Sequence, residues 1–145
     1  MTDALSDFNL SNALNEADRA LVLNPDSAIT RYAVAQALCA SGRLDEAAEH
    51  ARDGCAIDPM MAPINYFYGL VLYYQRFWDE AAEQLERTLE INPGFLTARA
   101  LRGRLETSRF RARSVWVLAA LSDVCGLGRH LIDTASPRSL QPLTV

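Results

Sequence analysis

The side chains able to carry out acid–base or nucleophilic chemistry are few and scattered. The two histidines, His50 and His130, are far apart, and we expect His50 on the exposed face of a helix. Cys39, Cys55 and Cys125 form no CxxC pair, a pattern that favours reduced, buried thiols over a metal or redox site. The sequence also has no GxGxxG, P-loop or HExxH motif. We therefore expect no enzyme activity, no catalytic residue, no metal and no cofactor.

Arginine is the one residue type that gathers in a way that suggests ligand chemistry. The chain has no lysine, and a run of arginines lies near its C-terminus: Arg99, Arg102, Arg104, Arg109, Arg111 and Arg113. Guanidinium groups bind phosphates and carboxylates, so this run is a candidate surface for an anion, a nucleic acid or an acidic partner. The alternative is a solvated end face that complements an acidic body, since residues 1–93 carry a net charge of −9 and residues 94–145 carry +5. We favour the solvated face because no nucleic-acid-binding motif accompanies the run.

A repeat organises the chain. Pro25, Pro59 and Pro93 lie 34 residues apart and close three similar phrases, LVLNP, CAIDP and LEINP. Upstream of two of them, residues 43–59 align without gaps to residues 77–93 and share the segment DEAAE. Acids that recur with the period are typical of helix N-termini rather than of a catalytic pair. A fixed period of this length predicts stacked supersecondary units.

Each period reads as two helices joined by a short turn. Residues 28–40 carry apolar side chains at helical spacing, and Gly42 ends this first helix. A second helix then ends before Pro59, because the residue before a proline disfavours helical backbone. The next period repeats this plan, with Arg76 at its turn. One pair cannot bury its apolar face alone, so the pairs must stack to build a core.

The pattern resembles the tetratricopeptide repeat family. The family's large, large, small and large residues of the first helix fall on Arg31, Val34, Ala35 and Leu38, and one period later on Asn65, Tyr68, Gly69 and Leu72. Four positions depart from the family: Arg31 and Asn65 replace an aromatic residue, and Gly54 and Thr88 replace an alanine. We expect these to weaken packing locally. The resemblance implies an all-α, right-handed solenoid of antiparallel helix pairs, with about seven helices.

The resemblance also implies where a partner binds, since the first helix of each pair lines the concave groove in this family. The groove residues so implied are Tyr32, Gln36, Tyr66, Leu70, Tyr73, Tyr74 and Arg104. Tyrosines offer large contact area at little rotamer cost, which suits an extended or helical peptide. The alternative is that some of these tyrosines belong to the core between repeats.

A second binding mode of the family is not expected here. Some members hold a partner's C-terminal carboxylate with Lys, Asn and Arg side chains on successive first helices. The positions concerned hold Tyr32, Gln36, Phe67, Thr97 and Leu101 in this chain. The charged clamp is therefore missing.

Both ends of the chain depart from the repeat. We divide the chain into an incomplete repeat with an orphan second helix (1–26), two repeats (27–60 and 61–94), a diverged repeat or capping helices (95–133) and a disordered tail (134–145). The orphan helix should expose an apolar stripe over residues 10–23 that is available for self-association. Residues 111–124 are expected to form a further helix, either a diverged cap or a segment unrelated to the repeat.

These features predict a non-catalytic protein–protein interaction module. It would bind a peptide or protein in the concave groove, as a scaffold or a sensory fragment of a larger bacterial regulator. The alternatives are an arginine-rich surface for nucleic acid or an acidic partner, and a homo-oligomer formed through the N-terminal helix. The sequence shows neither a signal peptide nor a membrane span, so we expect a cytoplasmic protein without a membrane partner.

Overall fold

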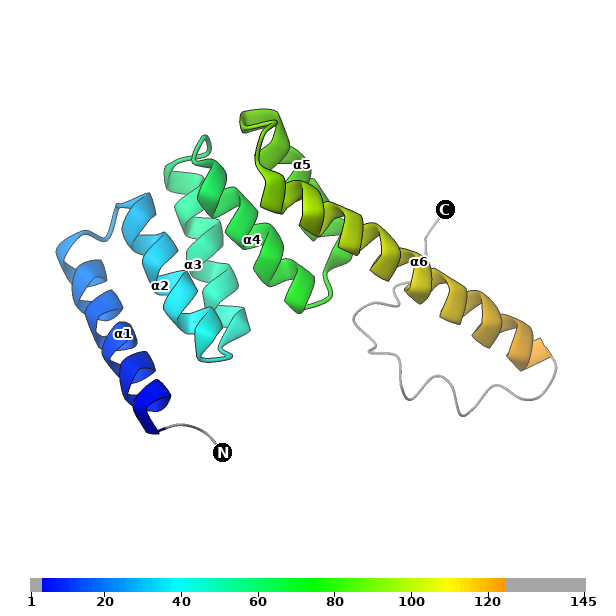
Figure 1. The fold of residues 1–145 in the computed structure, drawn as a ribbon, viewed down its shortest axis with the longest axis horizontal. Coiled ribbons are helices and arrows are strands. Elements are labelled where there is room, and N and C mark those ends of the chain that lie inside the picture. Colours follow the sequence, from blue (N-terminus) through cyan, green and yellow to red (C-terminus); the bar gives the residue numbers. More distant parts are fainter. Residues whose placement is uncertain (1–3, 125–145) are drawn as a thin grey trace.

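Six α-helices make up residues 4–124, the part of the chain that the computed structural model describes, with side chains described for residues 9–118. They are α1 (Ala4–Leu23), α2 (Ala28–Ala40), α3 (Leu44–Ile57), α4 (Ala62–Tyr74), α5 (Trp78–Ile91) and α6 (Leu96–Val124). Consecutive helices pack side by side in a row, and the C-terminal half of α6 extends beyond the other helices (Figure 1). The predicted tail at 134–145, Cys125 and His130 lie outside the described residues.

The 34-residue period sets the helix boundaries. The first helices α2 and α4 each have 13 residues and start at Ala28 and Ala62. The second helices α3 and α5 each have 14 residues and start at Leu44 and Trp78. Two acids in the first turn of both second helices favour this start, because negative charge stabilises the N-terminal end of the helix dipole.

The turn within each pair needs a left-handed residue. Gly42 has a φ of 80°, and one period later Arg76 has a φ of 66°. Glycine adopts this backbone freely, whereas a residue with a Cβ is strained there by about 1–2 kcal/mol. Arg76 therefore adopts nearly the same backbone geometry as Gly42, although it carries a Cβ. We infer that the packing of α4 against α5 imposes this turn.

Small residues let the two helices of a pair approach closely. Ala35 in α2, Ala47 in α3 and Ala81 in α5 are fully buried. A Cβ added to Gly69 would lie 3.3 Å from side-chain atoms of Leu85, so α4 and α5 are in close contact there. The result is two successive apolar cores, one built from α1 to α4 and the other from α4 to α6.

The two positions that lack the family's alanine are packed in other ways. A Cβ added to Gly54 would lie 2.1 Å from Ile64 Cδ1, so the isoleucine already fills the space that an alanine would take. The hydroxyl of the buried Thr88 donates to the carbonyl of Gln84 at 2.8 Å. The expected local weakening is therefore compensated at both positions.

The carbonyl of each closing proline accepts a hydrogen bond from a side chain six residues further on. The three bonds are Arg31 Nε to Pro25 O at 3.2 Å, Asn65 Nδ2 to Pro59 O at 3.1 Å, and Arg99 Nη2 to Pro93 O at 2.7 Å. Arg31 and Asn65 are the positions where the family's aromatic residue is missing. The recurring hydrogen bond from the next first helix to the proline carbonyl, which we call the proline brace, takes the place of the missing aromatic side chain. This corrects the expectation of weaker packing.

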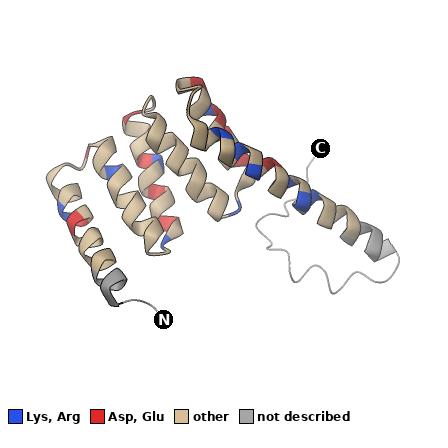
Figure 2. Ribbon diagram, viewed as in Figure 1, with Lys and Arg blue, Asp and Glu red and all other residues tan. Residues whose placement is uncertain are grey.

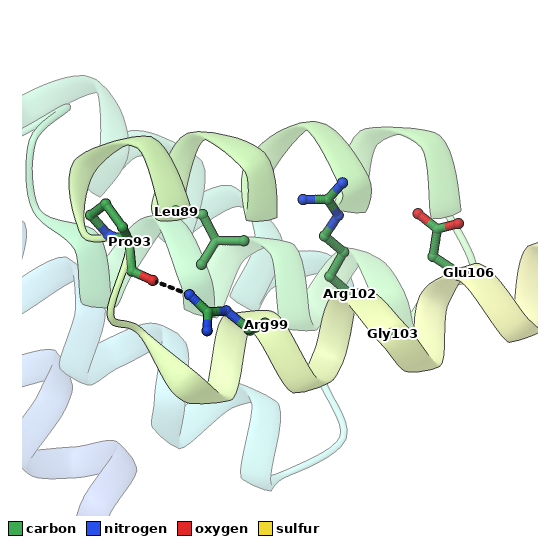
Figure 3. Close-up of a pocket in the computed structure, with 6 residues that line it drawn as sticks. All are labelled: Leu89, Pro93, Arg99, Arg102, Gly103 and Glu106. Atoms are coloured by element: carbon green, nitrogen blue, oxygen red, sulfur yellow. Dashed lines mark hydrogen bonds between the residues drawn. The ribbon is translucent and has the colours of Figure 1, made fainter.

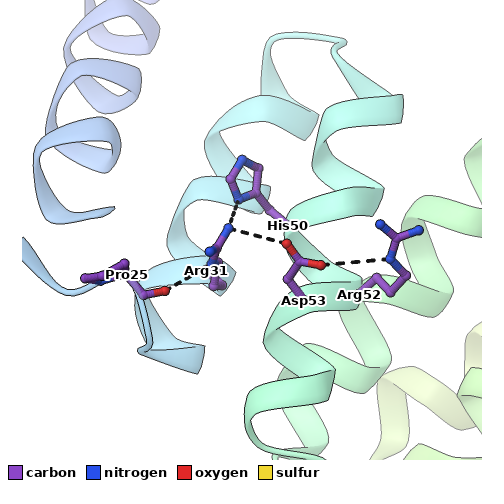
Figure 4. A network of polar contacts seen from close by, with 5 residues as sticks. All are labelled: Pro25, Arg31, His50, Arg52 and Asp53. Atoms are coloured by element: carbon purple, nitrogen blue, oxygen red, sulfur yellow. Dashed lines mark hydrogen bonds and ion pairs between the residues drawn. The ribbon is translucent and has the colours of Figure 1, made fainter. Parts of the chain in front are cut away.

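Arg31 also ties α2 to α3 (Figure 4). Its Nη1 lies 3.2 Å from His50 Nδ1 and 3.5 Å from Asp53 Oδ2. Because a guanidinium can only donate, His50 Nδ1 accepts and the ring proton lies on Nε2 in this arrangement. His50 is half-buried, not on a solvent-exposed face as expected.

Replacing Asn65 with Ala is expected to lower the free energy of unfolding by about 1 kcal/mol, because its amide donates to both Pro59 and Met61. The loss is limited, since Asn65 Oδ1 is buried without a hydrogen-bond partner among the described residues. Urea unfolding measures the change. The control is Arg99→Ala, which removes the equivalent bond of an exposed side chain and should change stability by less than about 0.5 kcal/mol. Equal losses from the two variants would contradict this role for the buried amide.

The last helix corrects the predicted helix count. Residues 96–124 form one helix of 29 residues, where we expected a reversal and a separate helix from residue 111. The described chain therefore has six helices and not about seven. Phe110 occupies the position of the turn residues Gly42 and Arg76. A bulky aromatic side chain is poorly suited to positive φ, so the helix continues through this position.

Candidate functional site

The first helices carry the predicted groove residues on what we call the first-helix face. It consists of Tyr32, Gln36, Tyr66, Leu70, Tyr73, Tyr74 and Arg104, which lie on α2, α4 and α6. Tyr32 and Tyr66 are one period apart, and so are Gln36, Leu70 and Arg104. None of the seven is buried: Gln36, Tyr74 and Arg104 are exposed and the other four are half-buried.

Two ring contacts link the first helices. Tyr32 of α2 meets Phe67 of α4 edge to face, with ring centroids 5.5 Å apart. Tyr66 of α4 meets Phe95, which directly precedes α6, at 5.2 Å. Phe67 and Phe95 were not among the predicted groove residues. Each of the two tyrosine rings packs between repeats and still keeps an accessible part.

Tyr32, Gln36 and Tyr66 form one cluster at the α2–α4 junction. Burial raises the pKa of the Tyr32 phenol, the neighbouring Tyr66 raises it further, and a hydrogen bond with Gln36 lowers it. The phenol therefore stays neutral around neutral pH and keeps its proton for donation. The structure brings these three predicted residues together from two helices.

The end of α4 carries a second aromatic group. The rings of Tyr73 and Tyr74 meet at 5.9 Å in an edge arrangement. Tyr73 packs on the core between α4 and α6, whereas Tyr74 is 55% exposed. Leu70, between this group and Tyr66 in the sequence, contacts both cores. Tyr74 is therefore the aromatic side chain of this face that is most open to a partner.

The arginine run divides into two parts. Three members are held by the chain itself: Arg99 donates to Pro93 O, Arg102 lies 3.8 Å from Glu86 Oε1, and Arg109 pairs with Asp79. The others, Arg104, Arg111 and Arg113, are exposed and have no ion pair within residues 9–118. The arginines follow α6, while acids mark α3 and α5 (Figure 2). Part of the run thus fastens α6 to acidic α5, and the run as a whole does not converge on one anion.

A groove that the sequence analysis did not identify lies between α5 and α6 (Figure 3). Its volume is about 520 Å³, and its lining residues are Leu89, Pro93, Arg99, Arg102, Gly103 and Glu106. We call it the α5–α6 groove. A Cβ added to Gly103 would meet nothing within 4 Å, whereas its equivalent Gly69 lies against α5. The 34-residue spacing of these two glycines was the signal in the sequence, but it does not tell whether a helix covers the second one.

Two thiols within the described residues are poor nucleophiles. Burial raises the pKa of Cys55 to about 11, and burial also raises the pKa of Cys39. A thiol with a raised pKa is mostly protonated at neutral pH and reacts slowly. In residues 9–118, no group of three or more His, Cys, Asp or Glu side chains is placed to hold a metal ion. No helix within residues 4–124 combines the length and apolar character needed to cross a membrane.

Comparison with known families gives a match to the tetratricopeptide repeat model over residues 3–61 and 69–109. The chain belongs to the tetratricopeptide repeat family. This confirms the resemblance inferred from the proline spacing and the DEAAE segments. No curated protein matches the chain.

Solved structures show the same tetratricopeptide fold. The Sgt2 tetratricopeptide domain of Aspergillus fumigatus has a TM-score of 0.70 at 24% identity, covering 77% of this chain and 75% of that one. The Arabidopsis OM64 tetratricopeptide domain has 0.66 at 21%, covering 72% and 87%. MamA has 0.63 at 22%, covering 86% of this chain and 63% of that one. Tetratricopeptide arrays are in general protein-interaction modules, and this chain has the fold of such a module.

Proposed function

We propose that this tetratricopeptide array binds a peptide or protein partner on its first-helix face and catalyses no reaction. The observation that carries the proposal is the cluster of Tyr32, Gln36 and Tyr66, whose rings are anchored by Phe67 and Phe95. Rings already fixed in the free protein lose little freedom on binding, so a smaller ordering cost offsets their contacts with a partner. Their polar tips can also orient a peptide backbone by hydrogen bonding.

The chemistry of the face favours an elongated ligand. The tyrosine cluster lies at the α2–α4 junction, and the Tyr73–Tyr74 pair adds a second aromatic group at the end of α4. Arg104 on α6 is exposed and unpaired within residues 9–118, so it suits a carboxylate of the partner. Since the positions of the family's charged clamp hold no Lys, Asn or Arg, recognition would use an internal segment and not a chain end. An apolar or aromatic segment flanked by an acidic residue fits these features.

The biological setting we propose is a scaffold or sensory segment of a larger cytoplasmic regulator in a bacterium. Nucleic acid is a weaker candidate, because Arg99, Arg102 and Arg109 are already engaged by the chain itself. Duplex binding that falls steeply with salt and is lost on Arg104→Gln and Arg111→Gln would favour that candidate instead.

A phage-displayed library of random peptides is the probe that tests the first-helix face. Selected peptides are measured by fluorescence anisotropy against the parent chain and three variants. We expect affinity to fall at least about tenfold in Tyr66→Ala/Tyr73→Ala and in Gln36→Glu/Arg104→Glu. The second variant changes only exposed side chains, so circular dichroism should show an unchanged fold.

The control for this experiment is Glu83→Arg, an exposed change on α5. It should leave peptide affinity as in the parent chain. Peptides that bind both first-helix variants as well as the parent, or that lose affinity only with Glu83→Arg, would reject the first-helix face as the binding site.

A further inference from the structure

The two ends of the described array are complementary halves of a helix pair. The second helices α3 and α5 run from Leu44 to Ile57 and from Trp78 to Ile91, and the same register one period earlier is residues 10–23, the main part of α1. The first helices α2 and α4 start at Ala28 and Ala62, and one period later α6 starts at Leu96. Among residues 4–124, α1 is thus a second helix without its first helix, and α6 is a first helix without its second.

The small residues that join the helices of a pair are exposed at both ends. Inside the array the equivalent small residues are Ala35 and Gly69 on the first helices and Ala47 and Ala81 on the second helices, and all four are buried. The equivalent position on α6 is Gly103, which is exposed and would have no neighbour within 4 Å of an added Cβ. The equivalent position on α1 is Ala13, which is also exposed. The chain therefore presents both surfaces of one helix-pair contact, at opposite ends.

We propose that α1 of a second copy docks in the α5–α6 groove of the first, so that copies of this chain associate head to tail. In the complex, the Ala13 face of α1 of one copy lies against Gly103 of the other, as α5 lies in the array against Gly69. The joint completes a helix pair and continues the 34-residue period from one copy into the next.

The lengths of the two helices fit this joint. Within a pair the second helix starts beside the end of the first, because the two run antiparallel. Compared with α3 and α5, α1 is longer at its start by residues 4–9. Compared with α2 and α4, α6 is longer at its end by residues 109–124. Both extensions fall at the same end of the joint and lie alongside each other, where α6 exposes Phe110, Trp116 and Val117.

Charge also favours the joint. Three acids and one arginine give α1 a charge of −2, and six arginines and two acids give α6 a charge of +4. The groove carries charged side chains that the equivalent contacts inside the array lack. Arg102 and Glu106 occupy the positions that hold Tyr68 and Leu72 one period earlier, where both residues pack on the core shared with α5. Because charged groups must lose water to be covered, the association is weaker than the contacts within the array, reversible and weakened by salt.

A contact between two different surfaces makes a specific prediction about mixtures. Sedimentation velocity of the parent chain should show a mass that rises with concentration above the 16.0 kDa of one chain. Ala13→Arg blocks the α1 surface and Gly103→Arg blocks the groove, and each variant alone should remain a single chain. Mixed in equal amounts, the two variants retain one intact joint between them. Their mixture should therefore reach the mass of two chains and no more.

Further variants test whether a change in association comes from this joint, from altered folding or from the first-helix face. Ala13 and Gly103 are exposed, so neither Arg variant should unfold at a lower temperature than the parent chain, and Gly103→Arg should be slightly more stable because arginine has the higher helix propensity. Glu106→Leu restores the residue type found at Leu72 and should tighten association about tenfold or more. Gln36→Glu, which changes an exposed side chain of the first-helix face on α2, should associate as the parent does. A parent chain that stays single at about millimolar concentration, Arg variants that associate as the parent does, or a mixture that stays single would overturn the proposal.

Discussion

The variant Leu101→Ala is expected to lower the free energy of unfolding by about 2–5 kcal/mol. Leu101 is fully buried in the core that α6 shares with α4 and α5, next to Leu85 and Leu105. Shortening it removes apolar contacts and leaves a cavity, because its neighbours are held by other packing contacts. Each unit of a repeat array contacts only its neighbours, so the loss should be concentrated in α6. Urea unfolding gives the total change, and hydrogen exchange shows whether α6 loses protection first.

The matched control for this variant lies in the same helix. Leu96 is 74% exposed, so Leu96→Ala removes the same atoms without opening a cavity and should change stability by less than about 0.5 kcal/mol. A similar loss from both variants would mean that α6 is not anchored through Leu101. Uniform loss of protection across α2 to α6 would show instead that the array unfolds as one unit.

The variant Gly54→Val is expected to lower the free energy of unfolding by about 3 kcal/mol. A Cβ on Gly54 would already lie 2.1 Å from Ile64 Cδ1 and 3.2 Å from Arg31 Cβ. A β-branched side chain has essentially one rotamer in a helix, so valine cannot turn away from the contact. Ile64 is fully buried, and its Cγ1 would also lie only 3.4 Å from the added Cβ, so rotation of the terminal methyl alone does not remove the close contact. The strain should therefore push α4 away from α3.

Gly103→Val is the control, because it makes the same change in a helix at a position where an added Cβ meets nothing within 4 Å. Valine and glycine differ by only a few tenths of a kcal/mol in helix propensity, so thermal unfolding at a dilute concentration should show almost no change. If both valine variants were equally unstable, backbone propensity would explain the effect and the Gly54–Ile64 contact would not.

The strain that Gly54→Val introduces is also expected to disturb the candidate binding face. Ile64 lies on α4 two residues before Tyr66, so a displaced α4 would disturb the ring contacts of Tyr66 and Phe67. A buried contact on one side of α4 thus supports the geometry of the side that we propose binds a partner. This link depends on the packing of helices from different repeats.

Only part of the candidate site could be predicted from the sequence. The period placed Tyr32 and Tyr66 at equivalent positions, and in the structure Tyr32 interacts electrostatically with Tyr66 and by a hydrogen bond with Gln36. Phe67 and Phe95, which hold these rings, were missed because their role arises between neighbouring helices. The proline brace was missed for a similar reason. Arg31 and Asn65 break the family pattern in the sequence, and only their distance to the proline carbonyls shows what they do.

The sequence by itself determined the repeat, its register and the helix pairs, because a 34-residue period of prolines, small residues and acids is a local pattern that recurs along one dimension. Only the tertiary structure decided what happens at the ends. Gly103 lies one period after the buried Gly69, yet α6 continues through Phe110 and the helix that would cover Gly103 does not form within residues 4–124. The chain turns back after a helix where a residue can adopt positive φ and where the following helix can bury its apolar side in a groove. Both conditions depend on contacts between segments, and without them Gly103 stays exposed on α6.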